Sequence, residues 1–140
     1  MSLFYVDTSA AIKLLAEETH SKDFAAFYDE RPTASWVSSS LLRIELTRAV
    51  VRRWPALLPD TRDLLTAFDY IGMDEEIVEA AVAEPDRTLR SLDAIHLATA
   101  RLLAHELDGF VTYDDQLATA AGDAGLPVLA PGATKRRDRE

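Results

Sequence analysis

Four acidic side chains stand where a carboxylate is unexpected unless it binds something. Two follow apolar runs, one lies beside the apolar stripe of a helix-like segment, and one opens another such segment: Asp7, Asp114, Glu45 and Asp93. The chain has no cysteine, and its three histidines are not spaced as metal ligands. A metal would therefore need oxygen ligands, which points to Mg²⁺, Mn²⁺ or Ca²⁺ rather than zinc.

Each of these acids also has a purely structural explanation. Asp7, Asp93 and Asp114 could cap helices or complement helix dipoles. Glu45 could pair with Arg48 at the edge of its stripe. Four clustered carboxylates, however, would repel one another unless they shared cations or protons. Taken singly, Glu45, Asp93 and Asp114 favour the structural explanation, and Asp7 is evenly balanced because Thr8 and Ser9 could cap equally well. The joint placement of the four acids favours a site.

The elements that must position these acids alternate along the chain. We expect strands at 3–6, 34–37, 70–73, 109–113 and 127–129. We expect helices at 9–18, 21–30, 59–68, 74–84, 91–107 and 115–124. A further long helix should begin with an N-cap among Ser38, Ser39 and Ser40 and end at about Trp54. This alternation predicts an α/β fold, a single-domain three-layer sandwich with a central parallel sheet of four to five strands flanked by helices.

The predicted domain covers 1–131, followed by a polar, basic tail at 132–140. In parallel sheets of this kind, ligands bind beyond the carboxyl ends of the strands, where the strand order reverses. Asp7 and Asp114 both follow predicted strands. The fold could therefore bring them together despite their separation in sequence.

Composition limits the function. The chain of 140 residues is 48% apolar, enough for a core, and has no segment long and apolar enough for a membrane span. The absence of cysteine and of a signal peptide leads us to expect a cytoplasmic protein that does not enter membranes. The net charge of −9 argues against a nucleic-acid partner, because such affinity rests on Lys and Arg. Metal bound by the four acids would offset part of that charge.

Four stretches resemble, in order, the motifs of the PIN-domain ribonucleases, specifically the VapC-type toxins of prokaryotic toxin–antitoxin pairs. They are YVDTSAAIKLL, SSSLLRIEL, SLDAIHLATA and FVTYDDQLA. The resemblance is collinear and covers nearly the whole chain apart from the basic tail. Its last motif, T-x-D-x-x-L, selects Asp114 over Asp115 as the fourth acid.

The resemblance implies a PIN-like fold and a metal-dependent endoribonuclease toxin that is neutralised by a small, VapB-like antitoxin and forms a homodimer. It also implies a catalytic, metal-binding quartet: Asp7, Glu45, Asp93 and Asp114. Thr8, Ser9 and Thr112 would be supporting hydroxyls. One or two Mg²⁺ or Mn²⁺ ions would activate water for in-line hydrolysis, leaving 5′-phosphate and 3′-hydroxyl ends. The preference for RNA comes from the resemblance alone, since this chemistry does not use the 2′-hydroxyl.

Other basic and histidine side chains have open roles. Four are candidates for phosphate contacts, with solvated helix faces and surface ion pairs as the alternative: Lys13, Arg43, Arg87 and Arg90. We expect His96, one turn beyond Asp93, to be structural.

Two other function classes compete with a nuclease. A non-catalytic PIN-like interaction module would use the acids only as helix caps. A phosphoryl-transfer domain of receiver or dehalogenase type also has Asp after its first strand. The dehalogenase pattern needs a second Asp where Ser9 stands, and a receiver needs an acidic pair before its first helix and a late Lys at a strand end. Neither pattern is present.

Overall fold

A five-stranded parallel sheet forms the centre of the protein, and the computed structural model describes residues 1–133 of the chain. The strands run in the spatial order β3-β2-β1-β4-β5. Their bounds are Leu3–Val6 for β1, Ser35–Ser39 for β2, Asp69–Ile71 for β3, Gly109–Val111 for β4 and Val128–Leu129 for β5. The predicted three-layer α/β architecture is confirmed. The predicted tail, 132–140, lies outside the described residues from 134 onward.

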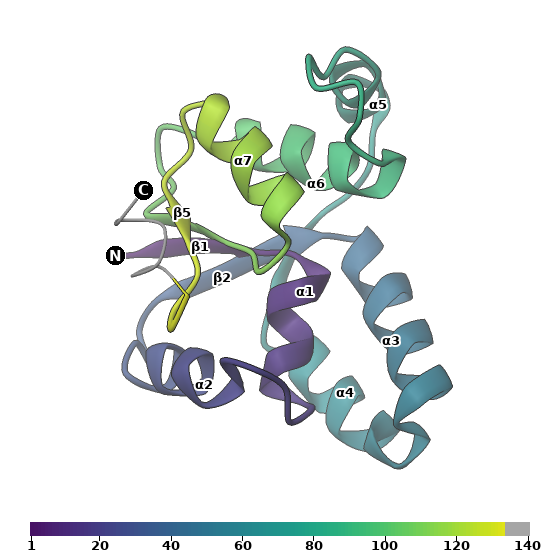
Figure 1. The fold of residues 1–140 in the computed structure, drawn as a ribbon, viewed down its shortest axis with the longest axis vertical. Helices are drawn as coiled ribbons and strands as arrows, with labels where there is room; N and C mark the ends of the chain where they lie inside the picture. Colours follow the sequence, from purple (N-terminus) through teal and green to yellow (C-terminus); the bar gives the residue numbers. More distant parts are fainter. Residues whose placement is uncertain (134–140) are drawn as a thin grey trace.

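Seven α-helices and two 3₁₀ turns connect the strands of the described chain. The helices are α1 Thr8–Ala11, α2 Ser21–Asp29, α3 Leu41–Arg53, α4 Leu58–Leu65, α5 Glu75–Val82, α6 Ser91–Arg101 and α7 Asp115–Asp123. The 3₁₀ turns are η1 Ile12–Leu14 and η2 Pro55–Leu57. Figure 1 shows α1 to α4 on one side of the sheet and α5 to α7 on the other.

Alternation along β1 builds two separate cores. Phe4 and Val6 point to the layer of α1 to α4, where Leu42 and Leu46 of α3 are fully buried. Tyr5 points to the opposite layer, which packs around residues of α6 and α7. Because successive side chains of a strand alternate between faces, an all-apolar β1 needs helices on both sides.

Two helices are shorter than predicted. The predicted helix at 9–18 is one α-turn, α1, followed by the 3₁₀ turn η1. The chain then leaves the helical path, because the Ser21 hydroxyl donates to the Ala16 carbonyl and accepts from the Glu18 amide. The predicted helix at 91–107 ends at Arg101, and the amides that follow donate to carbonyls three residues back instead of four. Apolar periodicity therefore extended both predictions past the true ends.

The three serines before α3 have different roles. Ser38 and Ser39 belong to β2, and the Ser38 hydroxyl donates to the Val6 carbonyl at 2.6 Å. Ser39 Oγ accepts from the Leu41 amide at 3.1 Å, so it supports the helix start from within the strand. Ser40 occupies the N-cap position without a capping side-chain bond. The predicted position of the N-cap among these serines is thus confirmed, whereas the side-chain bond to the helix start comes from Ser39.

Candidate active site

The strand order places its reversal between β1 and β4. β1 leads to β2 and β3 on one side, whereas β4 and β5 lie on the other. Val6 pairs with Val111 at the carboxyl end of these two strands. Asp7 follows Val6 directly, and Thr112 and Asp114 follow Val111. Segments more than a hundred residues apart in sequence therefore meet at the crevice where such folds bind ligands.

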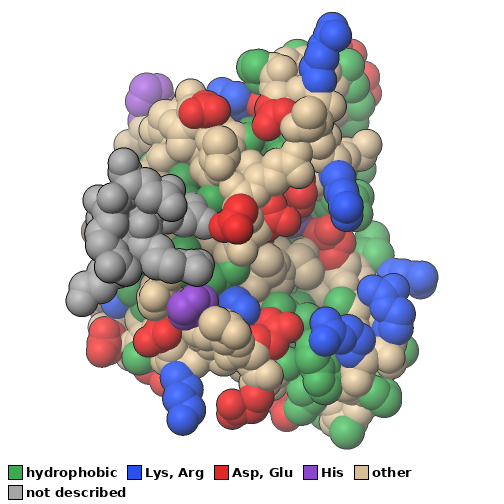
Figure 2. All heavy atoms as spheres, in the orientation of Figure 1, with side chains coloured by type: hydrophobic (Ala, Val, Ile, Leu, Met, Phe, Trp, Pro, Cys, Tyr) green, Lys and Arg blue, Asp and Glu red, His purple; other side chains and the backbone are tan. Residues whose placement is uncertain are grey.

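A cavity of about 330 Å³ opens at this crevice and collects the predicted residues. Its lining includes all four predicted acids and two of the predicted hydroxyls: Asp7, Glu45, Asp93, Asp114, Thr8 and Ser9. Thr112 reaches the same place by donating to Asp7 Oδ2 at 2.7 Å. Figure 2 shows acidic side chains gathered near the middle of this face of the molecule.

Asp7 is the most enclosed of the four acids, with 3% of its surface exposed. The Ser9 hydroxyl contacts its two oxygens at 2.8 and 2.9 Å, and the Ala10 amide donates to Oδ1 at 3.0 Å. Burial raises the pKa of Asp7, and the electrostatic interaction with His96 and the hydrogen bonds from Thr112, Ser9 and Ala10 oppose that rise. Asp7 is also the N-cap of α1, so the capping explanation describes part of its role.

Asp114 caps α7 in the same way. Its Oδ1 accepts from the Leu117 amide at 2.8 Å, and its own amide donates to Thr112 Oγ1. Asp115 instead lies in the first turn of α7. The N-cap bond fixes one carboxylate oxygen of Asp114 at the cavity wall.

Asp93 differs from its neighbours, because none of the described residues donates a hydrogen bond to its carboxylate. It lies in the first turn of α6, whose N-cap position is taken by Arg90. Burial together with the negative charges of Asp114, Asp7 and Glu45 raises the pKa of Asp93 to about 6. The cluster's mutual repulsion therefore falls mainly on this residue.

Glu45 is held by two donors at a single oxygen. Thr8 Oγ1 lies 2.8 Å from Glu45 Oε1, and His96 Nε2 lies 2.7 Å from the same atom. Burial alone would raise the pKa of Glu45, but the hydrogen bond and electrostatic interaction with His96, together with the hydrogen bond from Thr8, outweigh it and the pKa is lowered. The partner of Glu45 is thus His96, and the alternative pairing with Arg48 is wrong.

His96 is the functional candidate that the sequence underrated. It is 1% exposed, as a structural histidine would be, yet it contacts one of the four acids directly. The available signal was its position one turn after Asp93 on α6, the spacing that places two side chains on one helix face.

The four predicted phosphate-contacting residues are not grouped together. Arg90 lines the acidic cavity. Lys13 pairs with Glu18 at 3.3 Å and lies over the Tyr113 ring, whereas Arg43 lies over the Tyr70 ring. Arg87 lines a second, neighbouring cavity. Arg90 is therefore the best placed of the four to meet a phosphate at the acids.

Comparison with known proteins decides the family. The PIN domain family model matches residues 4–123. The chain belongs to the PIN-domain family. The match covers β1 through α7, which includes all four acids of the cavity.

Curated relatives of this PIN domain are ribonucleases. It is 39% identical over 135 residues to ribonuclease VapC35 of Mycobacterium tuberculosis, covering 95% of this chain and all of that protein. It is 35% identical over 136 residues to ribonuclease VapC47 of the same organism, again covering 95% and 100% of the two chains. The resemblance to VapC-type proteins is thereby confirmed.

Solved structures share the fold. A toxin–antitoxin complex from Klebsiella pneumoniae contains a chain with a TM-score of 0.64 and 27% identity, covering 94% of this chain and 98% of that one. The sarcin-ricin-loop-cleaving toxin VapC20 of M. tuberculosis has a TM-score of 0.73 at 17% identity, covering 91% and 99%. At 17% identity, the likeness to VapC20 supports the fold of this chain and nothing further.

The acids of this PIN domain fit a hard divalent cation of the Mg²⁺ type. Their donor atoms are all oxygens, and the pKa of Asp93 is raised by burial and by its acidic neighbours, whose repulsion a cation would relieve. No three acidic or histidine side chains within residues 1–133 form a complete ligand set by themselves. Mg²⁺ commonly keeps several waters and uses only one or two carboxylates, so an open set suits it.

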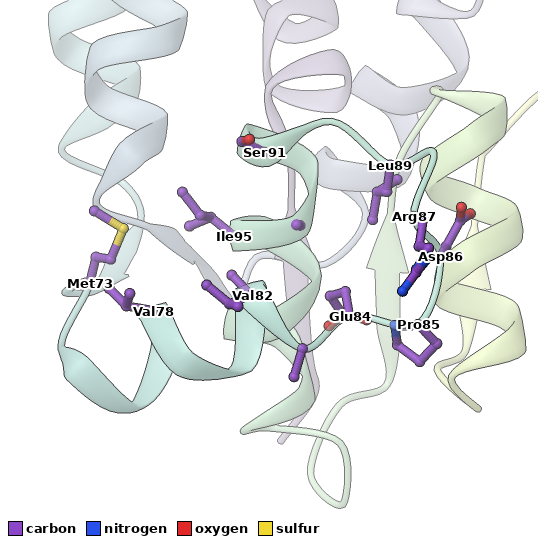
Figure 3. Close-up of a pocket in the computed structure, with 13 residues that line it drawn as sticks. Met73, Val78, Val82, Glu84, Pro85, Asp86, Arg87, Leu89, Ser91 and Ile95 are labelled. Atoms are coloured by element: carbon purple, nitrogen blue, oxygen red, sulfur yellow. The ribbon is translucent and has the colours of Figure 1, made fainter.

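A larger cavity of about 750 Å³ lies next to the acidic one, between α5 and α6. Ser91 lines both. Figure 3 shows apolar side chains from both sides at one end of the larger cavity: Met73, Val78, Val82 and Ile95. Its buried acid, Glu84, is neutralised by Arg101, whose Nε and Nη2 donate to the two carboxylate oxygens at 2.8 and 2.9 Å. The carboxylate chemistry of this PIN domain therefore lies in the smaller cavity.

One structural finding bears on the prediction that the chain has no membrane span. Among the described helices, none has both the length and the apolar character required to cross a bilayer.

Proposed function

We propose that this protein is a metal-dependent endoribonuclease toxin that hydrolyses RNA phosphodiester bonds at the acidic cavity. One observation carries the proposal: four carboxylates line one cavity at the strand-order reversal of a chain that is 39% identical to a ribonuclease along its length. Asp7, Glu45, Asp93 and Asp114 would hold Mg²⁺ or Mn²⁺, as one or two ions.

The chain's own residues divide the work. Ser9 and Thr112 hold the buried Asp7 carboxylate, and Thr8 holds Glu45, so these carboxylates are oriented before any substrate arrives. Arg90 lines the same cavity, where its charge would position a phosphate against the acids. A bound divalent ion would supply the charge that lowers the pKa of the attacking water and stabilises the leaving oxygen.

The products would carry 5′-phosphate and 3′-hydroxyl ends. In the proposed mechanism the attacking group is a water activated by the divalent ion, and the 2′-hydroxyl of the substrate takes no part. Selection of RNA over DNA is inferred from the ribonuclease relatives.

Partners follow the same line of inference. We infer a small protein antitoxin, because a chain that is 27% identical occurs in a toxin–antitoxin complex. We also keep the predictions of a homodimer and of a cytoplasmic location, where RNA is available. An antitoxin that places a cationic side chain at the cavity would meet the four acids and compete with the metal.

The test is RNA cleavage by the purified, antitoxin-free protein. Total RNA is incubated with Mn²⁺, with Mg²⁺ or with EDTA, in parallel with Asp93→Asn. This variant is chosen because Asp93 accepts no hydrogen bond from the described residues, so its loss should spare the fold. Asp60→Asn, which changes an exposed first-turn acid of α4, is the matched control. Sequencing of new 5′ ends then identifies the substrate.

The expected result is discrete cleavage that requires metal, persists in Asp60→Asn and is lost in Asp93→Asn. Equal cleavage by Asp93→Asn and the parent would refute the role of the acidic cavity. A folded, Mn²⁺-binding protein that cuts no RNA would instead favour the non-catalytic interaction module.

A further inference from the structure

Both ring nitrogens of His96 have partners inside the protein. Nδ1 lies 2.8 Å from the Tyr5 hydroxyl, and Nε2 lies 2.7 Å from Glu45 Oε1. Tyr5 lies on β1, Glu45 on α3 and His96 on α6. His96 is 91 positions from Tyr5 and 51 positions from Glu45 along the chain. A continuous hydrogen-bonded path therefore runs from the core beneath the sheet's switch point to the acidic cavity.

The direction of the protons at the cavity end of this path follows from Glu45. An ionised carboxylate only accepts hydrogen bonds, so the proton between His96 Nε2 and Glu45 Oε1 belongs to Nε2. At the other end of the ring, the Tyr5 hydroxyl lies at Nδ1 and also accepts from the Ser39 amide at 3.1 Å. The Nε2–H of His96 therefore donates to Glu45.

This arrangement treats the two oxygens of Glu45 differently. Oε1 receives both the Nε2–H of His96 and the hydroxyl of Thr8. Within residues 1–133 no donor reaches Oε2. No buried side-chain oxygen in the described chain lacks a partner, so Oε2 is open to solvent, and Glu45 lines the cavity. One oxygen is anchored and the other is left for a ligand.

We propose that Tyr5 and His96 are positioning residues, which hold the Glu45 carboxylate by a fixed Nε2–H donor so that Oε2 is presented to a divalent cation. The inference rests on the proposed function for the identity of that cation. The geometry resembles a carboxylate ligand fixed by an outer partner, an arrangement whose loss typically weakens metal binding by about 10- to 100-fold.

The alternative is a histidine that only fills the core. The two cases differ in what a substitution must preserve. His96→Gln keeps an N–H donor near the place of Nε2, whereas His96→Leu keeps the volume and removes the donor. Tyr5→Phe keeps the ring in the core and removes only the hydroxyl that holds Nδ1. His105→Gln is the matched control, because His105 is exposed in the turns after α6.

Two measurements test the proposal, and neither depends on cleavage. The first is the ¹⁵N spectrum of histidine-labelled protein at neutral pH without metal, in which the His96 signals are those missing from His96→Gln. The second is Mn²⁺ affinity by isothermal titration calorimetry, with melting temperatures showing that each variant is folded.

We expect Nε2 of His96 to carry a proton in the parent protein. We expect His96→Leu to weaken Mn²⁺ binding by about 10- to 100-fold, Tyr5→Phe to weaken it less, and His96→Gln and His105→Gln to stay close to the parent. If His96→Leu does not fold, the comparison of Tyr5→Phe with the parent carries the same test.

An Nε2 that carries no proton in the parent would overturn the proposal. Equal losses in His96→Gln and His96→Leu would overturn it as well, as would unchanged affinity in Tyr5→Phe. A parent protein that binds no Mn²⁺ would refute the proposed function, and this inference would fall with it.

Discussion

Asp93→Asn should make the metal-free protein more stable. Asp93 is the member of the cluster whose pKa is raised to about 6, by burial and by the charges of Asp114, Asp7 and Glu45. No described residue compensates with a hydrogen bond to its carboxylate. Replacing the carboxylate by a neutral amide of the same size removes the repulsion and leaves the packing unchanged.

The size of the effect follows from the pKa. A rise from 3.8 to about 6 corresponds to about 3 kcal/mol of unfavourable free energy in the ionised form. The side chain is only half-buried and solvent screens the repulsion, so we expect roughly 1–2 kcal/mol to be recovered. For a domain of this size, that raises the melting temperature by roughly 3–6 °C.

The sign of the pH dependence is fixed by the direction of the pKa change. Above about pH 6, Asp93 is ionised in the folded and the unfolded chain, so the folded state bears the full repulsion and Asp93→Asn shows its full gain. Between pH 6 and 4 the folded state keeps a proton that the unfolded chain loses, and the gain declines. Below the ordinary value of 3.8 both states are protonated and the gain disappears.

Thermal melts followed by circular dichroism in EDTA, from pH 4 to pH 8, measure this difference. Asp60→Asn controls for the loss of a first-turn helix acid, which by itself costs about 0.3–1 kcal/mol. Adding Mn²⁺ should reverse the order, because the parent gains binding free energy that Asp93→Asn has lost. A gain that is independent of pH, or a variant less stable than the parent at pH 8 in EDTA, would refute the repulsion argument.

Further predictions concern the packing around the site. Gly109→Ala should lower the free energy of unfolding by about 1–3 kcal/mol, since a Cβ there would clash with the Leu129 and Phe4 side chains. Gly122→Ala, whose Cβ would meet nothing within 4 Å, should instead raise the free energy of unfolding by about 0.5–1 kcal/mol. Urea titrations of both variants check the opposite signs. Arg101→Ala should lower the free energy of unfolding by about 1–3 kcal/mol, because it leaves the buried Glu84 unpaired, and Arg101→Lys should lower it by less. Amide hydrogen exchange in α5 should become faster in proportion to this loss of stability. Unchanged exchange would show that the pair does not hold α5 to α6.

Local sequence patterns were enough to predict the scaffold. The first strand was predicted at 3–6 and the structure has Leu3–Val6, because a short run that is apolar at every position can only be buried on both faces. The acids at strand ends were predicted to converge for a topological reason, since parallel strands present their carboxyl ends to one edge. Where Asp7 and Asp114 lie could thus be predicted without any knowledge of their neighbours.

The partners of these acids could not be predicted in the same way. Glu45 has a cation one turn away on its own helix, Arg48, yet it bonds to His96, 51 positions further along. Tyr5 reads as one more apolar residue of a buried strand, although its hydroxyl meets the same histidine across 91 positions. Such pairings depend on the relative placement of β1, α3 and α6, which helical or strand periodicity does not determine.

Capping a helix and forming the site turn out to be parts of one arrangement. Asp7 and Asp114 each accept a backbone amide at the start of a helix, and these bonds hold their carboxylates beside the cavity. The hydrogen bonds that Glu45 receives favour its ionised form. Asp93 has no such donor, and burial together with the charges of its acidic neighbours raises its pKa, so a divalent cation is the ligand that would relieve this site.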